Sequence, residues 1–77
     1  MNIKENLERI CIAVLNDKYD SSTFMSYLGT ALIEDDELQK IVDEIKDNLE
    51  KDIYTVLDEE QLFRRKKYAK FLLDIIK

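Results

Sequence analysis

The residues of this 77-residue chain that could do chemistry are mostly carboxylates, and their usual catalytic companions are missing. The chain has no histidine, the commonest general base and a frequent metal ligand. With one cysteine and one glycine, it has neither a zinc-binding cysteine set nor a glycine-rich phosphate loop. The run Asp35-Asp36-Glu37 lacks the spacing and the glycine of a calcium loop and is typical of a helix start. We therefore expect no metal, no cofactor and no enzymatic activity.

Size and composition indicate one helical domain spanning residues 1–77. Charged residues make up 38% of the chain and proline is absent, which favours helices. A chain of this length can hardly enclose the pocket of several hundred Å³ that ligand sites need. No apolar run approaches the ~18–20 residues of a membrane-spanning helix. Acids by the fifth residue argue against a signal peptide, and Cys11 as the only cysteine fits a reducing cytoplasm.

A long amphipathic helix over residues 36–57 is the main element that positions the carboxylates. Its apolar residues recur at the helical period and form one narrow stripe: Leu38, Val42, Ile45, Leu49, Ile53 and Val56. Asp52 falls near this stripe, which predicts a kink or break around Lys51-Asp52. Other helices must cover the stripe, so the fold class is all-α.

Three further helices complete a compact small bundle, with a three-helix alternative if the middle boundaries merge. The first covers residues 2–16 and places Cys11 beside its apolar face, as a buried small hydrophobe. The second has Asp20 or Ser21 as its N-cap and runs to about residue 33, with Leu32 inward. Gly29 in its interior indicates a close helix–helix contact or, alternatively, a hinge or the approach of a ligand. The long helix over residues 36–57 is the third in chain order, and we expect Asp35 or Asp36 to cap it.

The last helix covers residues 58–76, and its start carries a strong local signal. Asp58 followed by Gln61 has the form of a capping box, and Leu57 with Leu62 has the form of a hydrophobic staple. We expect Asp58 to be the N-cap of this helix.

Charge is distributed unevenly along the chain, although the net charge is only −5. Residues 34–61 carry three bases and twelve acids, whereas residues 62–77 carry six bases and one acid. Either the last helix packs antiparallel to the acidic helix and the charges pair, or the basic helix binds a partner. The residues that would bind in the second case are Phe63, Arg64, Lys67, Lys70 and Phe71.

These patterns predict a small acidic cytoplasmic protein that acts by binding another protein. The outer face of the long helix, with Asp43, Glu44, Asp47 and Glu50, would mask a basic partner, as an inhibitor or immunity protein of a nuclease does. A homo-oligomer with a structural or regulatory role is the first alternative. Weak nucleic-acid binding through the basic helix is the second, because an acidic protein is a poor ligand for nucleic acid or a membrane surface.

Overall fold

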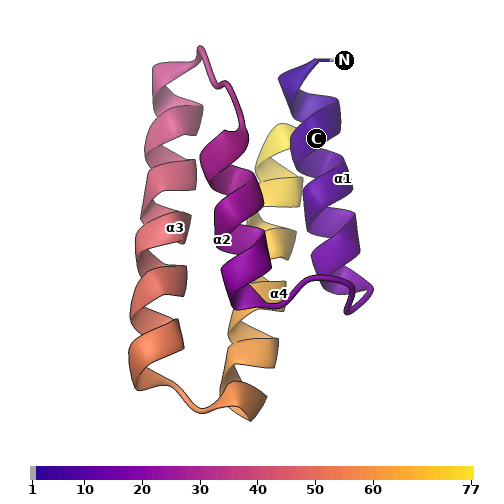
Figure 1. The fold of residues 1–77 in the computed structure, drawn as a ribbon. Coiled ribbons are helices and arrows are strands. Elements are labelled where there is room, and N and C mark those ends of the chain that lie inside the picture. Colours follow the sequence, from indigo (N-terminus) through magenta and orange to yellow (C-terminus); the bar gives the residue numbers. More distant parts are fainter. Residues whose placement is uncertain (1) are drawn as a thin grey trace.

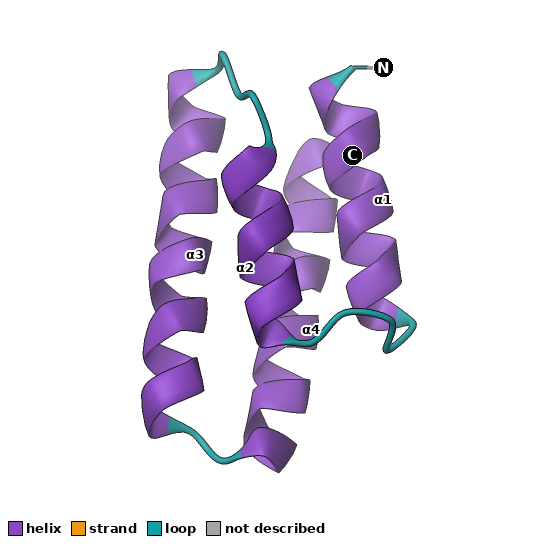
Figure 2. Cartoon of the chain, in the orientation of Figure 1, coloured by secondary structure: helices purple, strands orange, loops and turns teal. Residues whose placement is uncertain are grey.

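The computed structural model describes residues 2–77, which form four α-helices joined by short connections. In chain order the helices are α1 (Ile3–Leu15), α2 (Ser21–Thr30), α3 (Asp36–Thr55) and α4 (Asp58–Ile76). Residues 2–77 contain no strand (Figure 2). The all-α class is confirmed, and the chain forms four helices rather than three.

Consecutive helices run in opposite directions (Figure 1). α1 packs mainly on α4, and α2 packs mainly on α3. α3 and α4 form an antiparallel hairpin whose connection is Val56 and Leu57. The basic helix therefore lies beside the acidic helix, as the charge pattern predicted.

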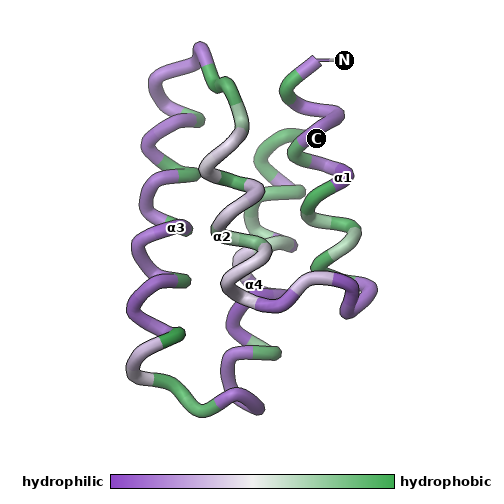
Figure 3. Tube along the Cα trace, viewed as in Figure 1, coloured by the Kyte–Doolittle hydropathy of each residue, from purple (hydrophilic) through white to green (hydrophobic). Residues whose placement is uncertain are grey.

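The interior of the bundle is filled by the apolar faces that the helical period predicted. On α3 the residues Leu38, Val42, Ile45 and Leu49 are buried, and the apolar positions of that helix face the other helices (Figure 3). Burial of each such side chain contributes about 1.5–3 kcal/mol. The rest of the buried apolar core comes from the other three helices: Leu7, Ile10, Cys11, Val14, Phe24, Leu28, Ala69, Leu72 and Ile76.

Three of the four helices begin at a polar residue whose side chain caps the first turn. Asn2, Asp20 and Asp35 each accept a hydrogen bond from the backbone N–H three residues further on, at 2.8, 2.8 and 3.1 Å. These bonds satisfy N–H groups that have no partner within the helix. Of the two N-cap candidates predicted for each helix, the structure has Asp20 for α2 and Asp35 for α3.

The second helix ends earlier than predicted. α2 stops at Thr30, Ala31 is extended, and Leu32 is 88% exposed rather than inward. Gly29 and Thr30 are both poor helix formers. The Thr30 hydroxyl also donates to the carbonyl of Tyr27 at 2.8 Å, a bond within the last turn. The apolar residues that follow were wrongly taken as a continuation of the helix.

The close helix contact expected at Gly29 is also absent. A Cβ atom built at this position would meet no heavy atom within 4 Å, and the φ angle of Gly29 is not positive. Neither the packing nor the backbone conformation of residues 2–77 requires a glycine there.

The kink predicted near Asp52 does not occur, because α3 continues as one helix through this position. Asp52 is only 4% exposed and occupies the place on the stripe that follows Leu49. Two hydrogen bonds from α4 satisfy its carboxylate. The conflict between a charge and the apolar stripe is resolved by partners on another helix rather than by a break.

The start of α4 differs from the predicted capping box. Leu57, not Asp58, is the N-cap residue, and no side chain caps the helix. Gln61 donates through Nε2 to the carbonyl of Val56 at 2.7 Å and does not reach back to the cap N–H. Leu57 is exposed, so it does not form the predicted staple with Leu62. Asp58 is instead the first helical residue, where its negative charge interacts favourably with the positive end of the helix dipole.

Candidate functional site

The four acidic residues predicted to bind a partner are all exposed on α3, and we call Asp43, Glu44, Asp47 and Glu50 the acidic surface. Asp43 is partly neutralised within its own helix, because Lys46 lies 3.4 Å away and Gln39 donates a hydrogen bond to it at 2.8 Å. The other three have no ion-pair partner within residues 2–77. Their charge is therefore available to a partner.

Part of the acidic surface borders a hollow between α2 and α3. Lys46, Asp47 and Glu50 line it from α3, and Met25, Ser26 and Gly29 line it from α2. The ammonium of Lys46 pairs with Asp43, which leaves Asp47 and Glu50 as the carboxylates at this hollow without an ion pair in residues 2–77. Its volume is about 330 Å³. The missing side chain of Gly29 leaves this hollow open. The sequence offered the approach of a ligand at Gly29 as an alternative, but it did not place Asp47 and Glu50 there, because the open space depends on how α2 packs against α3.

The basic run Arg64-Arg65-Lys66-Lys67 does not form a patch. Successive residues on a helix project about 100° apart, so Arg65 and Lys66 leave α4 on sides other than that of Arg64 and Lys67, which lie three residues apart. Arg64 pairs with Asp52 of α3 at 2.8 Å, and Lys66 pairs with Asp17 before α2 at 2.8 Å. Lys67 remains exposed. Of these two pairs, only Arg64–Asp52 joins the basic helix to the acidic helix as the first reading expected, whereas Lys66 pairs with the connection before α2.

Asp52, Arg64 and Tyr68 form a hydrogen-bonded network between α3 and α4. Arg64 Nε and the Tyr68 hydroxyl each donate to Asp52 Oδ2 at 2.8 Å, and Arg64 Nη2 donates to the Tyr68 hydroxyl at 3.1 Å. Burial disfavours the charged form of Asp52, but the hydrogen bonds and the Arg64 charge outweigh it and lower the pKa of the carboxyl below its ordinary value. Burial and the bond to Asp52 raise the pKa of Tyr68. Arg64, a predicted binding residue, is thus engaged inside the fold although its side chain is 48% exposed.

The predicted binding residues of α4 come together only in part. Arg64, Lys67 and Phe71 line a hollow of about 470 Å³ with Tyr68 and with Asn48 of α3. The other two predicted residues, Phe63 and Lys70, do not line this hollow. Phe63 is 75% exposed and Phe71 is 55% exposed, so both rings are available to a partner.

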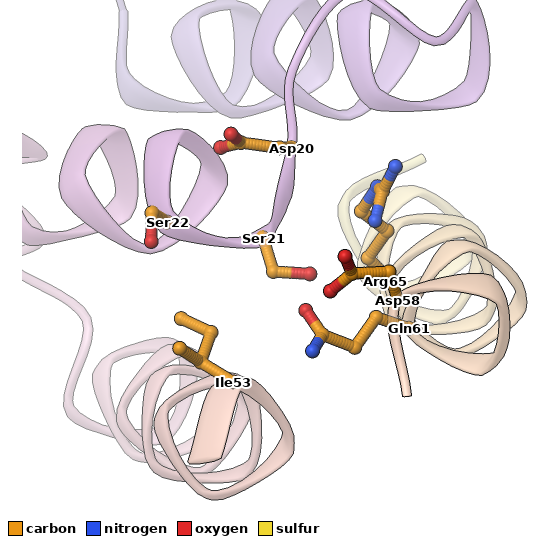
Figure 4. Close-up of a pocket in the computed structure, with 7 residues that line it drawn as sticks. All are labelled: Asp20, Ser21, Ser22, Ile53, Asp58, Gln61 and Arg65. Carbon is orange, nitrogen blue, oxygen red and sulfur yellow. The ribbon is translucent and has the colours of Figure 1, made fainter. Parts of the chain in front are cut away.

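A further polar hollow, also of about 330 Å³, lies where the starts of α2 and α4 meet (Figure 4). Ser21, Asp58 and Gln61 point toward one another across it, and Arg65 lies alongside Asp58. Sequence reasoning missed this place. The signals were a serine at a helix start and an arginine in the basic run, but only the tertiary fold brings them together.

Chemical groups elsewhere in the chain give little sign of catalysis. Within residues 2–77, no three or more histidine, cysteine or carboxylate side chains are grouped so that they could hold a metal ion. Burial raises the pKa of Cys11 to about 12, which disfavours the reactive thiolate. None of the helices in this part of the chain is long and apolar enough to cross a membrane. The absence of enzymatic activity stays a prediction.

Comparison with known proteins adds no relative from which a function could be carried over: no protein-family model, no curated protein and no solved structure matches the chain.

Proposed function

We propose that this protein acts by binding a second protein that has a basic surface, and that the acidic surface of α3 makes the contact. The observation that carries the proposal is the combination of exposed, unpaired charge with a hollow. Asp47 and Glu50 stand at the edge of the space left open by Gly29. Masking a basic surface in this way is how an inhibitor or immunity-type protein would act.

The hollow suits one basic side chain of the partner. A lysine or arginine lays its apolar stem along Met25 and Gly29, and its charged end reaches the carboxylates of Asp47 and Glu50. Glu44 and Asp43, outside the hollow, add to the field that steers the partner toward it. The two effects separate in kinetics, since steering acts on the association rate and the seated side chain on the dissociation rate.

The experiment starts by isolating the partner by affinity capture from the source cells and then measures association by surface plasmon resonance. Reversing Glu44, Asp47 and Glu50 to lysine should slow association at low salt. The effect should shrink at high salt, because screening acts over ~8–10 Å near physiological ionic strength. Lys70→Glu, a charge reversal on α4, is the matched control and should not slow association. Unchanged association of the triple variant at low salt refutes the proposal.

A graded series at Gly29 tests the hollow itself. The methyl group of Gly29→Ala meets no heavy atom of the fold within 4 Å, and the longer side chain of Gly29→Gln occupies more of the hollow. Dissociation of the captured partner should become faster with the size of the side chain. Equal dissociation rates across the series would place the contact elsewhere on the acidic surface.

Self-association through α4 is the second candidate, and the exposure of Phe63 and Phe71 favours it. Aromatic side chains among bases are typical anchors of protein interfaces. Lys67 and Lys70 beside them could meet the acidic surface of a second copy. Sedimentation velocity over a range of concentrations tests this candidate: a dimer that Phe63→Ser with Phe71→Ser abolishes supports it, and a monomer at all concentrations excludes it.

Nucleic-acid binding through α4 ranks third. Arg64 and Lys66 are held in ion pairs, so few cations of the basic run remain to neutralise phosphates. Affinity for nucleic acid depends on the number of such contacts, so we expect only weak binding. Fluorescence anisotropy with a labelled single strand checks this expectation.

A further inference from the structure

The hollow between the starts of α2 and α4 holds two polar groups whose hydrogen bonding is incomplete. Ser21 is only 2% exposed, yet its Oγ has no hydrogen-bond partner within residues 2–77. The Nε of Arg65 is also buried without a partner in this part of the chain. Buried polar groups are nearly always paired, so two such atoms beside one hollow point to a bound polar molecule.

Both α2 and α4 contribute donors to this hollow. Arg65 belongs to no ion pair of the described chain, and the Ser21 hydroxyl points into the hollow (Figure 4). α2 begins here, and the N–H groups of a first helical turn carry a partial positive charge. α4 also begins here, without a side-chain cap. Together these groups favour an oxyanion.

The hollow also has acceptors, which come mainly from α4. The carboxylate of Asp58 points into the hollow toward Ser21 (Figure 4). Gln61 uses its Nε2 in the bond to Val56, so its Oε1 remains as an acceptor. Asp20 also borders the hollow, but its carboxylate is turned toward the N–H of Thr23, and that bond lowers the pKa of Asp20. These groups favour a positively charged donor.

Charge balance then selects the class of ligand. A simple oxyanion would meet Arg65 but be repelled by Asp58, and a simple cation would meet Asp58 but be repelled by Arg65 and by the helix starts. We propose that this hollow binds a small zwitterion, with an oxyanion and a protonated amine on neighbouring atoms, of which a free α-amino acid is the simplest. The oxyanion lies against Arg65 and Ser21, and the amine lies against Asp58 and Gln61. Ile53, which forms the apolar part of the wall, receives a short aliphatic side chain.

The test is a titration of the full-length, ¹⁵N-labelled protein with glycine and with L-alanine, followed by NMR. The Nε–Hε signal of Arg65 and the backbone N–H signals of Ser21 and Ser22 should shift and saturate. Acetate and methylammonium each supply one half of the zwitterion. Each should bind at least about tenfold more weakly than glycine, because each loses a charge-assisted contact. All titrations are made at equal ionic strength.

Variants separate the site from a general effect of added salt. Ser21→Ala, Arg65→Gln and Asp58→Asn should each weaken binding of both amino acids. The matched controls are Ser26→Ala, an exposed serine of α2, and Lys70→Gln, an exposed cation of α4, and they should bind as the parent protein does. The spectrum of each variant without ligand shows that it is folded.

The proposal is overturned if neither amino acid produces a saturable shift at Arg65. It is equally overturned if acetate alone binds as well as glycine, since the hollow is then an anion site that Asp58 does not help. Stronger binding by Asp58→Asn would lead to the same conclusion. None of these outcomes bears on the acidic surface of α3, which lies outside this hollow.

Discussion

Tyr68→Phe tests whether the buried carboxylate of Asp52 depends on hydrogen bonds from α4. The substitution removes one hydroxyl and leaves the ring in place. In the parent protein that hydroxyl donates to Asp52 Oδ2 at 2.8 Å and accepts from Arg64 Nη2 at 3.1 Å. Its loss leaves Arg64 as the only donor to a carboxylate that is 4% exposed.

The expected loss of stability follows from the charge on the acceptor. A hydrogen bond to a charged group contributes about 1.5–3 kcal/mol. Arg64 keeps its own bond to the same oxygen, and its side chain is 48% exposed, so water can reach part of the network. We therefore expect the lower part of that range, about 1.5–2 kcal/mol at neutral pH.

The pH dependence has a definite sign. The folded pKa of Asp52 is lowered, so its ionisation contributes stability above the unfolded value of about 3.9, and this contribution is lost as pH falls through the folded pKa. Tyr68→Phe removes part of the cause of that lowering. The stability difference between parent and variant should therefore be largest at pH 7 and shrink below about pH 4.

Urea denaturation at pH 7 and at pH 3 measures both quantities. Tyr54→Phe is the matched control, because Tyr54 is exposed and its hydroxyl has no hydrogen bond within residues 2–77. In an Asp52→Leu background, Tyr68→Phe should cost less than about 0.5 kcal/mol, since the acceptor is gone. If Tyr68→Phe costs no more than Tyr54→Phe, or the same with and without Asp52, the network does not stabilise the fold.

Three further substitutions or reactions test local features. Gly29→Ala should raise the free energy of unfolding by about 0.4–1 kcal/mol in urea denaturation, because no neighbour opposes the new methyl group. Asp58→Ala should cost only about 0.3–0.5 kcal/mol by the same measurement, since the side chain contributes through the helix dipole and not as a cap. If the free energy of unfolding falls by more than about 1 kcal/mol, Asp58 acts as the N-cap after all. Cys11 should not react with Ellman's reagent at pH 8 until urea unfolds the protein, because burial raises its pKa to about 12.

The sequence predicted those parts of the fold that depend on local period. The stripe of α3 was found because a helix that buries one face needs apolar residues every three or four positions. Asp52 broke the pattern, and the sequence alone predicted a kink there. The true solution could not be seen locally, because the partners Arg64 and Tyr68 lie 12 and 16 residues away on another helix.

Helix ends were harder to predict, because several residues compete for the same backbone groups. At the start of α4, Asp58 and Gln61 match the capping pattern, yet Gln61 finds a better acceptor in Val56 outside the helix. At the end of α2, Leu32 matches the apolar period, yet Gly29 and Thr30 have already weakened the helix. The predicted cap of α4 and the predicted end of α2 were both wrong because a local pattern does not include the other hydrogen-bond partners and conformations that the folded chain offers.

The candidate sites show why charge counted along the chain is a poor guide to charge on the surface. The run 64–67 is the strongest concentration of positive charge in the sequence, but successive residues on a helix point about 100° apart, so only Arg64 and Lys67 of the run share a side of α4. One of them satisfies Asp52, one pairs with Asp17, and Arg65 lies beside a hollow of its own. The acids of α3 recur at three and four positions instead, so they stay on the outer side of one helix. The acidic residues therefore remain a surface after folding, whereas the basic residues become separate contacts, and this difference favours α3 over α4 as the face that meets a partner.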